Sequence, residues 1–110
     1  MTPLELAVVA HLVADWLLQN DWMALHKTSL KHPAAWVHAG IHGVLLGFAL
    51  DPLAGLVLGI VHLLIDTRVP LEWWMRVVKK CDKAPNRDLI AVWTDQVLHI
   101  ATIAAWVGLA

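Results

Sequence analysis

The stretch Asp51-Pro-Leu-Ala-Gly-Leu-Val-Leu-Gly-Ile-Val-His62-Leu-Leu-Ile-Asp66 carries the pattern that decides the fold. It opens with Asp51 and Pro52, residue types that are favoured at a helix N-cap and at the first helical position. The following residues are apolar on every side, as in a helix surrounded by lipid. His62 and Asp66 interrupt this apolar run, and a spacing of four places both side chains on one face of a helix. The stretch therefore predicts an apolar helix with one polar site.

The same spacing recurs once in each of the other apolar segments. The pairs are His11/Asp15, His38/His42, His62/Asp66 and Asp95/His99. Random placement of seven His and seven Asp in 110 residues would give roughly 1.7 such pairs, whereas four are present. The remaining His and Asp residues fall in expected loops or at segment edges. Four such faces turned inward would form a metal-binding cage.

Four long helices and one short helix are predicted. They cover about residues 3–25, 33–50, 52–69 and 88–109, with a short amphipathic helix at about 70–83. The hydrophobic content of 59% exceeds the roughly 45 to 50% that is typical of soluble domains. At 1.5 Å per residue, each long segment can cross most of a hydrocarbon core of about 30 Å. We expect one all-α domain over residues 1–110, a four-transmembrane-helix bundle with an interfacial helix between its third and fourth helices.

The cations indicate how such a bundle would be oriented. All eight Lys and Arg residues lie in two connections, between the first and second segments and between the third and fourth. The positive-inside rule places both connections in the cytoplasm and both termini outside, in a multi-pass protein of the inner membrane. No removable signal peptide is expected at the start. The net charge of −1 gives no basic footprint for nucleic acid, and the single Cys81 excludes an internal disulfide. A homo-oligomer is left open.

The paired residues suit divalent metal ions. The candidate ligands are His11, Asp15, His38, His42, His62, Asp66, Asp95 and His99. Residue counts from the segment ends place these side chains at a similar depth, in the cytoplasmic half of the membrane. Their number exceeds the four ligands of one tetrahedral site and suits two or more ions. Nitrogen and oxygen ligands without thiolate suit zinc and leave manganese and iron open. A bound cation would also compensate for aspartates inside a membrane, each of which costs roughly 2.5 to 3.5 kcal/mol when unpaired.

Further polar and aromatic groups lie near these pairs in the sequence. The candidates for support of the metal or for substrate binding are Gln19, Gln96, Trp16, Lys27 and Arg68. Gln19 continues the His11/Asp15 face by one turn, and Trp16 follows Asp15. Lys27, Arg68 and Arg76 could attract an anionic headgroup, although cations at such positions commonly serve as membrane anchors. Asp66 and Asp95 are the candidate catalytic residues, one of them as general base.

Several of these strings resemble those of a known family. The strings are His11-Leu-Val-Ala-Asp15-Trp16-Leu-Leu-Gln19, Trp22-Met23-Ala24 with Lys27, His62-Leu-Leu-Ile-Asp66 and Asp95-Gln96-Val-Leu-His99. Together they resemble the signatures of a bacterial and phage family, domain of unknown function 3307. The resemblance implies a small membrane-spanning protein and says little about the substrate. A looser similarity connects the chain with small membrane-bound metal-dependent hydrolases.

Three classes of function follow from this pattern. The first is a membrane-embedded metal-dependent hydrolase that acts on an ester or phosphoester of a lipid or lipid-linked substrate at the cytoplasmic leaflet. The second is a transporter or channel for metal ions or protons, although the outer halves of three segments lack the polar groups that such a path requires. The third is a structural membrane protein that is held together by a metal. Each pair alone could also be a hydrogen bond between helices or part of a proton relay.

Overall fold

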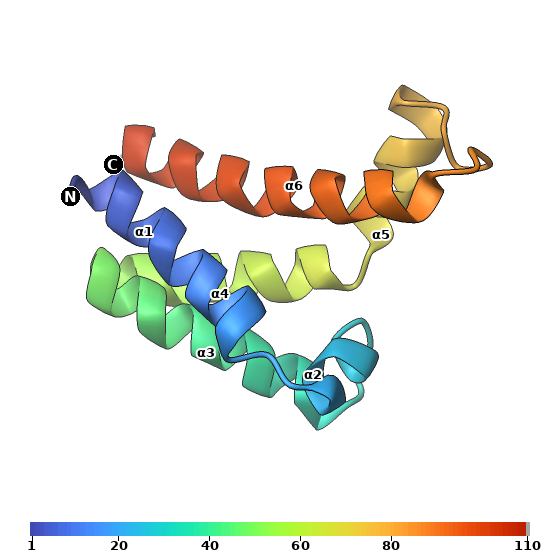
Figure 1. Cartoon of the computed structure of the whole chain (residues 1–110). Coiled ribbons are helices and arrows are strands. Elements are labelled where there is room, and N and C mark those ends of the chain that lie inside the picture. The colour runs from blue at the N-terminus through green and yellow to red at the C-terminus, as the bar shows by residue number, and fades with distance from the viewer. Residues whose placement is uncertain (110) are drawn as a thin grey trace.

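The computed structural model describes residues 1–109, all of whose regular elements are helical, so the predicted all-α class is confirmed. Residue 110, the last of the predicted domain, lies outside this range. The elements are α1 (Pro3–Leu12), the π-helical turn η1 (Val13–Leu17), α2 (Asp21–His26), α3 (Pro33–Ala49), α4 (Pro52–Asp66), α5 (Val69–Trp73), the π-helical turn η2 (Trp74–Val78) and α6 (Arg87–Leu109). Helices α1 and α4 each pack against both α3 and α6, which closes a four-helix bundle. Both termini lie at one end of this bundle, and α2 and α5 lie at the other (Figure 1).

The first helix is shorter than the predicted range of 3–25. After η1 the chain leaves the helical conformation, and Asn20 adopts an extended backbone. The Asn20 side chain accepts a hydrogen bond of 3.0 Å from the Met23 amide and so caps the separate helix α2. The apolar pattern of the sequence continues through this break, so the sequence gives no sign that the first helix ends here. An Asn side chain that bonds to the backbone favours a cap over a helix interior, and this local preference ends the first helix.

The amphipathic helix is also shorter than its predicted range of 70–83. It comprises α5 and η2 and ends at Val78. Lys80 then adopts a left-handed backbone with φ of 55°, and the Cys81 amide donates to the Met75 carbonyl at 2.9 Å. A left-handed residue of this kind commonly terminates a helix. Leu71 and Met75 are buried on the inner side of the segment, as its apolar face requires.

Glycines set the distance between α3 and α4. A Cβ atom on Gly43 would lie 3.1 Å from the Gly55 carbonyl oxygen, and one on Gly59 would lie 3.2 Å from the Gly43 Cα. Both contacts are tighter than ordinary van der Waals separation, so a side chain at either position would push the two backbones apart by a few tenths of an ångström. Gly43 and Gly47, like Gly55 and Gly59, are four residues apart, the spacing that allows close contact between membrane helices. The crossing brings the His-bearing faces of α3 and α4 together.

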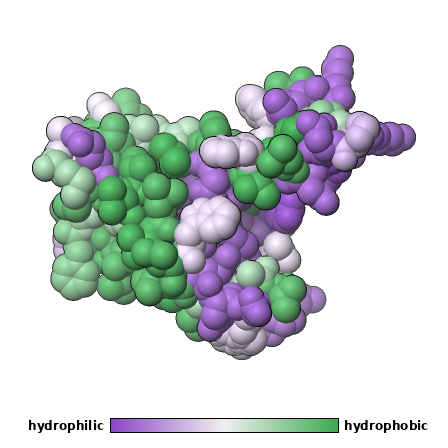
Figure 2. Space-filling view, in the orientation of Figure 1, coloured by the Kyte–Doolittle hydropathy of each residue, from purple (hydrophilic) through white to green (hydrophobic). Residues whose placement is uncertain are grey.

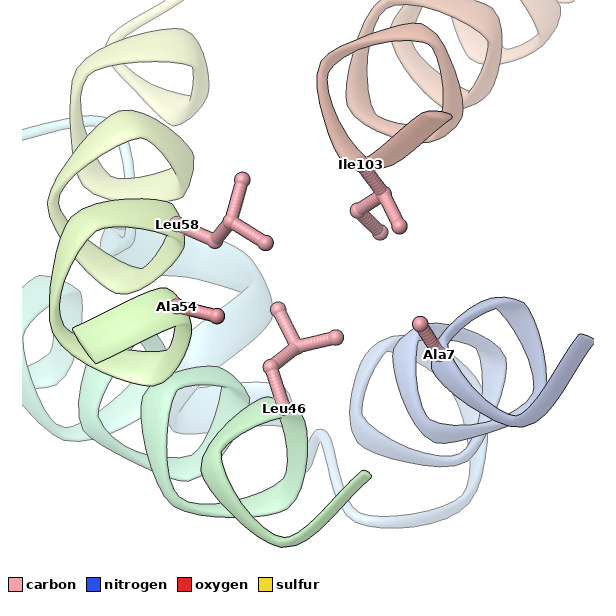
Figure 3. Close-up of a cluster of buried hydrophobic side chains, with 5 residues drawn as sticks. All are labelled: Ala7, Leu46, Ala54, Leu58 and Ile103. Atoms are coloured by element: carbon pink, nitrogen blue, oxygen red, sulfur yellow. The ribbon is translucent and has the colours of Figure 1, made fainter. Parts of the chain in front are cut away.

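An apolar layer fills the bundle next to the polar side chains. It consists of Ala7, Leu46, Ala54, Leu58 and Ile103, which are contributed by all four bundle helices (Figure 3). Leu46, Leu58 and Ile103 also line a void of about 10 Å³ that four buried histidines border. The apolar layer therefore covers the histidines on the side that faces the two termini.

The outer surface of the bundle is largely apolar. On α4, the exposed residues Leu53, Leu56, Ile60 and Leu64 follow the helical period and face away from the polar interior. Hydrophobic residues cover the end of the molecule that carries the termini, and hydrophilic residues gather around α2 and α5 (Figure 2). Among the helices described within residues 1–109, only α6 is long and apolar enough to cross a membrane by itself. Helix α4 and the α5–η2 segment, which are bent by 54° relative to each other, meet the same criterion only as a pair. Of the remaining bundle helices, α3 is apolar but only 17 residues long.

Candidate metal centre

The polar residues of the predicted pairs meet in the interior of the bundle. Those that are buried are His11, Asp15, His38, His42, His62, Asp66 and His99, none of them more than 5% exposed. They come from α1, η1, α3, α4 and α6. In each helix the spacing of four places both members of a pair on the inner face. The buried layer consequently combines five imidazoles with two carboxylates.

The first carboxylate is placed by the π-helical turn. Asp15 lies within η1, where the Leu18 amide donates to the Val13 carbonyl at 3.0 Å and widens the helix by one residue. Turns of this kind are frequent at functional sites. Asp15 Oδ1 lies 3.3 Å from His38 Nε2 and 3.5 Å from His42 Nε2. One oxygen of Asp15 therefore faces both histidines of α3.

The second carboxylate stands at the end of α4. Asp66 Oδ2 lies 2.8 Å from His62 Nε2 and 3.3 Å from His38 Nε2. Its other oxygen, Oδ1, lies 3.3 Å from His99 Nε2 on α6. Asp66 thus faces imidazoles from three different helices.

The separations between these atoms match a coordination sphere. Four of the five nitrogen–oxygen distances that involve Asp15 and Asp66 are 3.3 to 3.5 Å, longer than the usual hydrogen bond of about 2.7 to 3.2 Å. A tetrahedral site with metal–ligand bonds of about 2.0 to 2.1 Å places its ligand atoms about 3.3 to 3.4 Å apart. Within residues 1–109, neither Asp15 Oδ1 nor either Asp66 oxygen has a hydrogen-bond partner. Most of these separations could therefore accommodate an ion between the ligand atoms.

The donors form two overlapping groups that could each hold a metal ion. The first consists of Asp15, His38, His42 and His62, and the second of His62, Asp66 and His99. Within each group the ligand atoms lie within 4.8 Å of one another. The first group supplies the four ligands of a closed tetrahedral site, and the second supplies three and leaves a position for water or substrate. His62 belongs to both groups. A neutral imidazole has a single lone pair, so His62 could serve two ions at once only as a bridging imidazolate.

His11 lies beside these groups rather than in them. Its Nε2 is 2.9 Å from Gln96 Oε1, and Gln96 Nε2 donates to Asp15 Oδ2 at 2.5 Å. Gln96 therefore connects the imidazole of α1 to the carboxylate of η1. A hydrogen bond to Oδ2 fixes the orientation of the carboxylate, and with it the position of Oδ1, the oxygen that faces the histidines. The sequence places Gln96 next to the site but gives no sign of this bridge.

Asp95 is likewise outside both ligand groups. Its side chain is 18% exposed, and its Oδ1 lies 3.6 Å from His99 Nδ1. The Asp95 backbone carbonyl accepts a hydrogen bond of 2.7 Å from the same nitrogen. With Nδ1 donating, the lone pair of His99 lies on Nε2, the atom that faces Asp66. Asp95 thus orients a candidate ligand and keeps its own carboxylate accessible.

A cavity of about 220 Å³ opens beside the buried layer on the side of α2 and α5. The carboxylates of Asp15, Asp66 and Asp95 line its inner part. All the supporting residues expected from the sequence also lie on its wall, namely Trp16, Gln19, Gln96, Lys27 and Arg68. Arg76 is exposed on η2 and does not line the cavity. Thr28 lines it without having been expected, because a residue in a short loop has no periodic signal.

Comparison with known proteins identifies a family for nearly the whole chain. The model of the family described as protein of unknown function (DUF3307) matches residues 4–109. No curated protein and no solved structure matches the chain.

Proposed function

The chain belongs to the DUF3307 family of proteins of unknown function, and we propose that it is a membrane-embedded metal-dependent hydrolase. Its substrate would be an ester or phosphoester of a lipid or lipid-linked molecule at the cytoplasmic leaflet. The observation that carries the proposal is the buried layer of imidazole nitrogens and carboxylate oxygens at coordination spacing, directly beside an open cavity. A metal site that is reached by a cavity is the usual arrangement of a catalytic centre.

The apolar exterior supports a location in the membrane. The exposed face of α4 and Phe48 of α3, which is 86% exposed, would place large hydrophobic side chains in water if the protein were soluble. Helix α6 is long enough to span the bilayer, and the shorter helices α1, α3 and α4 would be embedded around it. Lys27, Arg68 and the other cations lie around α2 and α5, so the positive-inside rule would put this end and the cavity at the cytoplasm.

The donor set supports two divalent ions. Imidazole and carboxylate without thiolate suit zinc, and manganese or iron is the alternative. The group of Asp15, His38, His42 and His62 would hold an ion with protein ligands alone. The group of His62, Asp66 and His99 would leave a position open toward the substrate. An ion at that position would polarise the scissile bond and make a water molecule a better nucleophile.

Asp95 is the residue best placed to act as general base. It lies on the cavity wall, is partly exposed and belongs to neither ligand group. It can therefore take a proton from the attacking water and return it to the leaving group. Asp66 would serve as a ligand, with His38, His62 and His99 around it. Gln96 would hold Asp15 in position.

The apolar layer favours hydrolysis over transport. Leu46, Leu58 and Ile103 point toward one another between the helices (Figure 3). The same three side chains border the void beside the histidines, on the side away from the cavity. An ion that entered from the cavity would meet this layer rather than a second row of polar groups, and such a layer is a barrier to charge. A cavity with an opening on one side is suited to a substrate that enters and leaves by the same route.

The test is hydrolysis in mixed micelles of detergent with carboxylic ester lipids, phosphodiester lipids and phosphomonoester lipids. We expect one class to be cleaved by the zinc-loaded protein and not after chelation. Asp95→Asn should lower kcat by roughly 100-fold or more, the scale of general base catalysis, and should retain its metal because Asp95 is outside the ligand groups. The matched control is Asp88→Asn at the exposed start of α6, which should keep full activity. A metal-loaded protein that cleaves none of the three classes would contradict the proposal.

A further inference from the structure

The cavity beside the metal centre contains two cations in addition to its three carboxylates. Lys27 and Arg68 line it together with Asp15, Asp66 and Asp95. In the chain up to residue 109, no carboxylate lies within 4.0 Å of the Lys27 ammonium. Arg68 forms one ion pair, in which its Nε lies 3.8 Å from the Glu72 carboxylate. Within residues 1–109, the two terminal nitrogens of its guanidinium form no ion pair. Both cations are therefore available to a ligand.

The backbone at Arg68 adds a second, independent observation. Arg68 adopts a left-handed conformation with φ of 69° and ψ of 3°, in the short connection between α4 and α5. This conformation is unfavourable for a residue with a Cβ atom, and residues held in it are concentrated at binding and catalytic sites. The conformation lets the chain turn immediately after Asp66, so that the guanidinium and the Asp66 carboxylate line the same cavity.

The charge balance of the loaded site points to an anion. Two divalent ions, Lys27 and Arg68 together would outweigh the three carboxylates of the cavity, so a cavity next to both ions would carry several net positive charges. A carboxylic ester brings no charge to compensate for them. A phosphomonoester brings about two negative charges near neutral pH, and its oxygens suit both metal ions and guanidinium.

The size of the cavity and the residues at its rim further restrict the kind of ligand that we expect. A volume of about 220 Å³ has room for several water molecules and so accommodates a phosphate group. Trp16 and Val92 line the cavity and are also 65% and 48% exposed at the apolar surface. A hydrocarbon tail could leave between them, toward the bilayer.

We propose that this cavity binds the phosphate group of an amphiphilic phosphomonoester, held by Lys27 and Arg68, with its tail directed past Trp16 and Val92. The inference rests on the metal-dependent hydrolase proposed above and names its substrate class. In the reaction, the oxygen of water forms a bond to phosphorus and the bond from phosphorus to the lipid oxygen breaks. The proton released by the water passes through Asp95 to the lipid oxygen, so the products are inorganic phosphate and an alcohol. Inorganic phosphate is accordingly a product and a direct probe of the site.

The experiment is isothermal titration of the zinc-loaded protein in detergent with inorganic phosphate and with dodecylphosphonate, which has a tail but no bond that can be hydrolysed. We expect both ligands to bind and the phosphonate to bind more tightly. Lys27→Met and Arg68→Gly should each weaken phosphate binding by roughly 10- to 100-fold, and both variants should keep their zinc. Glycine at position 68 also relieves the backbone strain, so a loss of binding there cannot be ascribed to unfolding. Lys31→Met changes an exposed cation outside the cavity and should bind phosphate as the unmodified protein does.

The outcomes separate this inference from the proposed function. Zinc-loaded protein that binds no phosphate would overturn the inference, as would unchanged phosphate affinity in the two cavity variants. Equal affinities for phosphate and dodecylphosphonate would overturn the path assigned to the tail. A failure of the metal centre itself would be recognised separately, because the zinc content of every sample is measured before the titration.

Discussion

His42 of α3 and His62 of α4 stack against each other with their ring centroids 3.5 Å apart and an interplanar angle of 21°. Two protonated imidazoles would repel each other at this distance, whereas neutral rings can stack and present their nitrogens to an ion. The stack exists because the backbones of α3 and α4 approach closely at Gly43, Gly55 and Gly59. The geometry of the candidate metal centre therefore depends on glycines that are not ligands themselves.

Substitution of a glycine at the crossing of α3 and α4 should reduce metal binding, although the glycines are not ligands. A Cβ atom on Gly55 would overlap the Gly43 carbonyl oxygen and approach the Gly47 backbone. We expect Gly55→Ala to force the helices apart, to lower the free energy of unfolding by about 1 to 3 kcal/mol and to reduce the bound metal. Thermal unfolding in detergent and elemental analysis would measure the two effects.

Helix α3, the partner of α4 at the crossing, offers a matched control for this substitution. A Cβ atom on Gly40 would meet no atom within 4 Å, so Gly40→Ala should leave both metal content and stability unchanged or slightly increased. Equal metal content and equal stability of the two variants would show that the helix crossing does not determine the geometry of the site.

Gln96 should matter for metal affinity although it belongs to neither ligand group. It bridges His11 and Asp15, so Gln96→Leu would leave the Asp15 carboxylate without its buried donor. We expect a loss of metal affinity of roughly 10- to 100-fold, as for other residues that orient metal ligands. A competition titration with a chromophoric chelator would measure it. Val97→Ala, on the exposed side of α6, should retain the native affinity, and a native affinity for Gln96→Leu would exclude the orienting role.

Removal of the metal should destabilise the fold. Without an ion, two carboxylates and several imidazoles are buried with unpaired atoms, which is costly in a bundle interior. A ligand present at 1,000 times its dissociation constant stabilises by about 4 kcal/mol, so chelation should lower the unfolding temperature and zinc should restore it. Acidification should act in the same direction, because protons compete with the ion for the imidazole nitrogens. An unfolding temperature that is insensitive to both chelation and pH would contradict this role of the ion.

The apolar layer predicts that the protein is not a passage for ions. Leu46, Leu58 and Ile103 close the interior beyond the histidines, and an apolar barrier of this kind opposes the movement of charge. Liposomes that contain the protein and a zinc- or pH-sensitive dye should show no flux above that of protein-free liposomes, and an ionophore serves as the positive control. Flux that rises with the amount of protein would favour the transport alternative.

The sequence was sufficient for those features that depend on local spacing. Pairs four residues apart must share a face of a helix, and residue counts from the segment ends place the pairs at a similar depth. Together these two features were sufficient to expect that His38, His42 and His62 converge. Pro33 and Pro52 stand at the observed starts of α3 and α4, because proline is suited to the first turn of a helix.

The features that the sequence did not reveal depend on competition between a side chain and the helical backbone, or on contacts between residues that are far apart in the sequence. The cap at Asn20 ends a helix whose apolar pattern continues, and no periodic signal marks it. The bridge from Gln96 to Asp15 joins residues that are 81 positions apart. The separation of Asp95 from the ligand groups is a matter of side-chain placement, since its spacing to His99 is the same as that of the other pairs.

Metal binding by the buried layer is tested by the metal content of the protein purified in detergent and supplied with zinc. The measurement compares the unmodified chain with His62→Ala/Asp66→Ala, which removes the histidine shared by both ligand groups and the carboxylate of one. His26→Ala, a change of an exposed histidine outside the layer, is the matched control. If the buried layer binds metal, we expect stoichiometric zinc in the unmodified chain and in His26→Ala and none in the double variant, with all three still helical by circular dichroism. This is the central expectation for the protein. Zinc retained in the double variant, or absent from the unmodified chain, would contradict it.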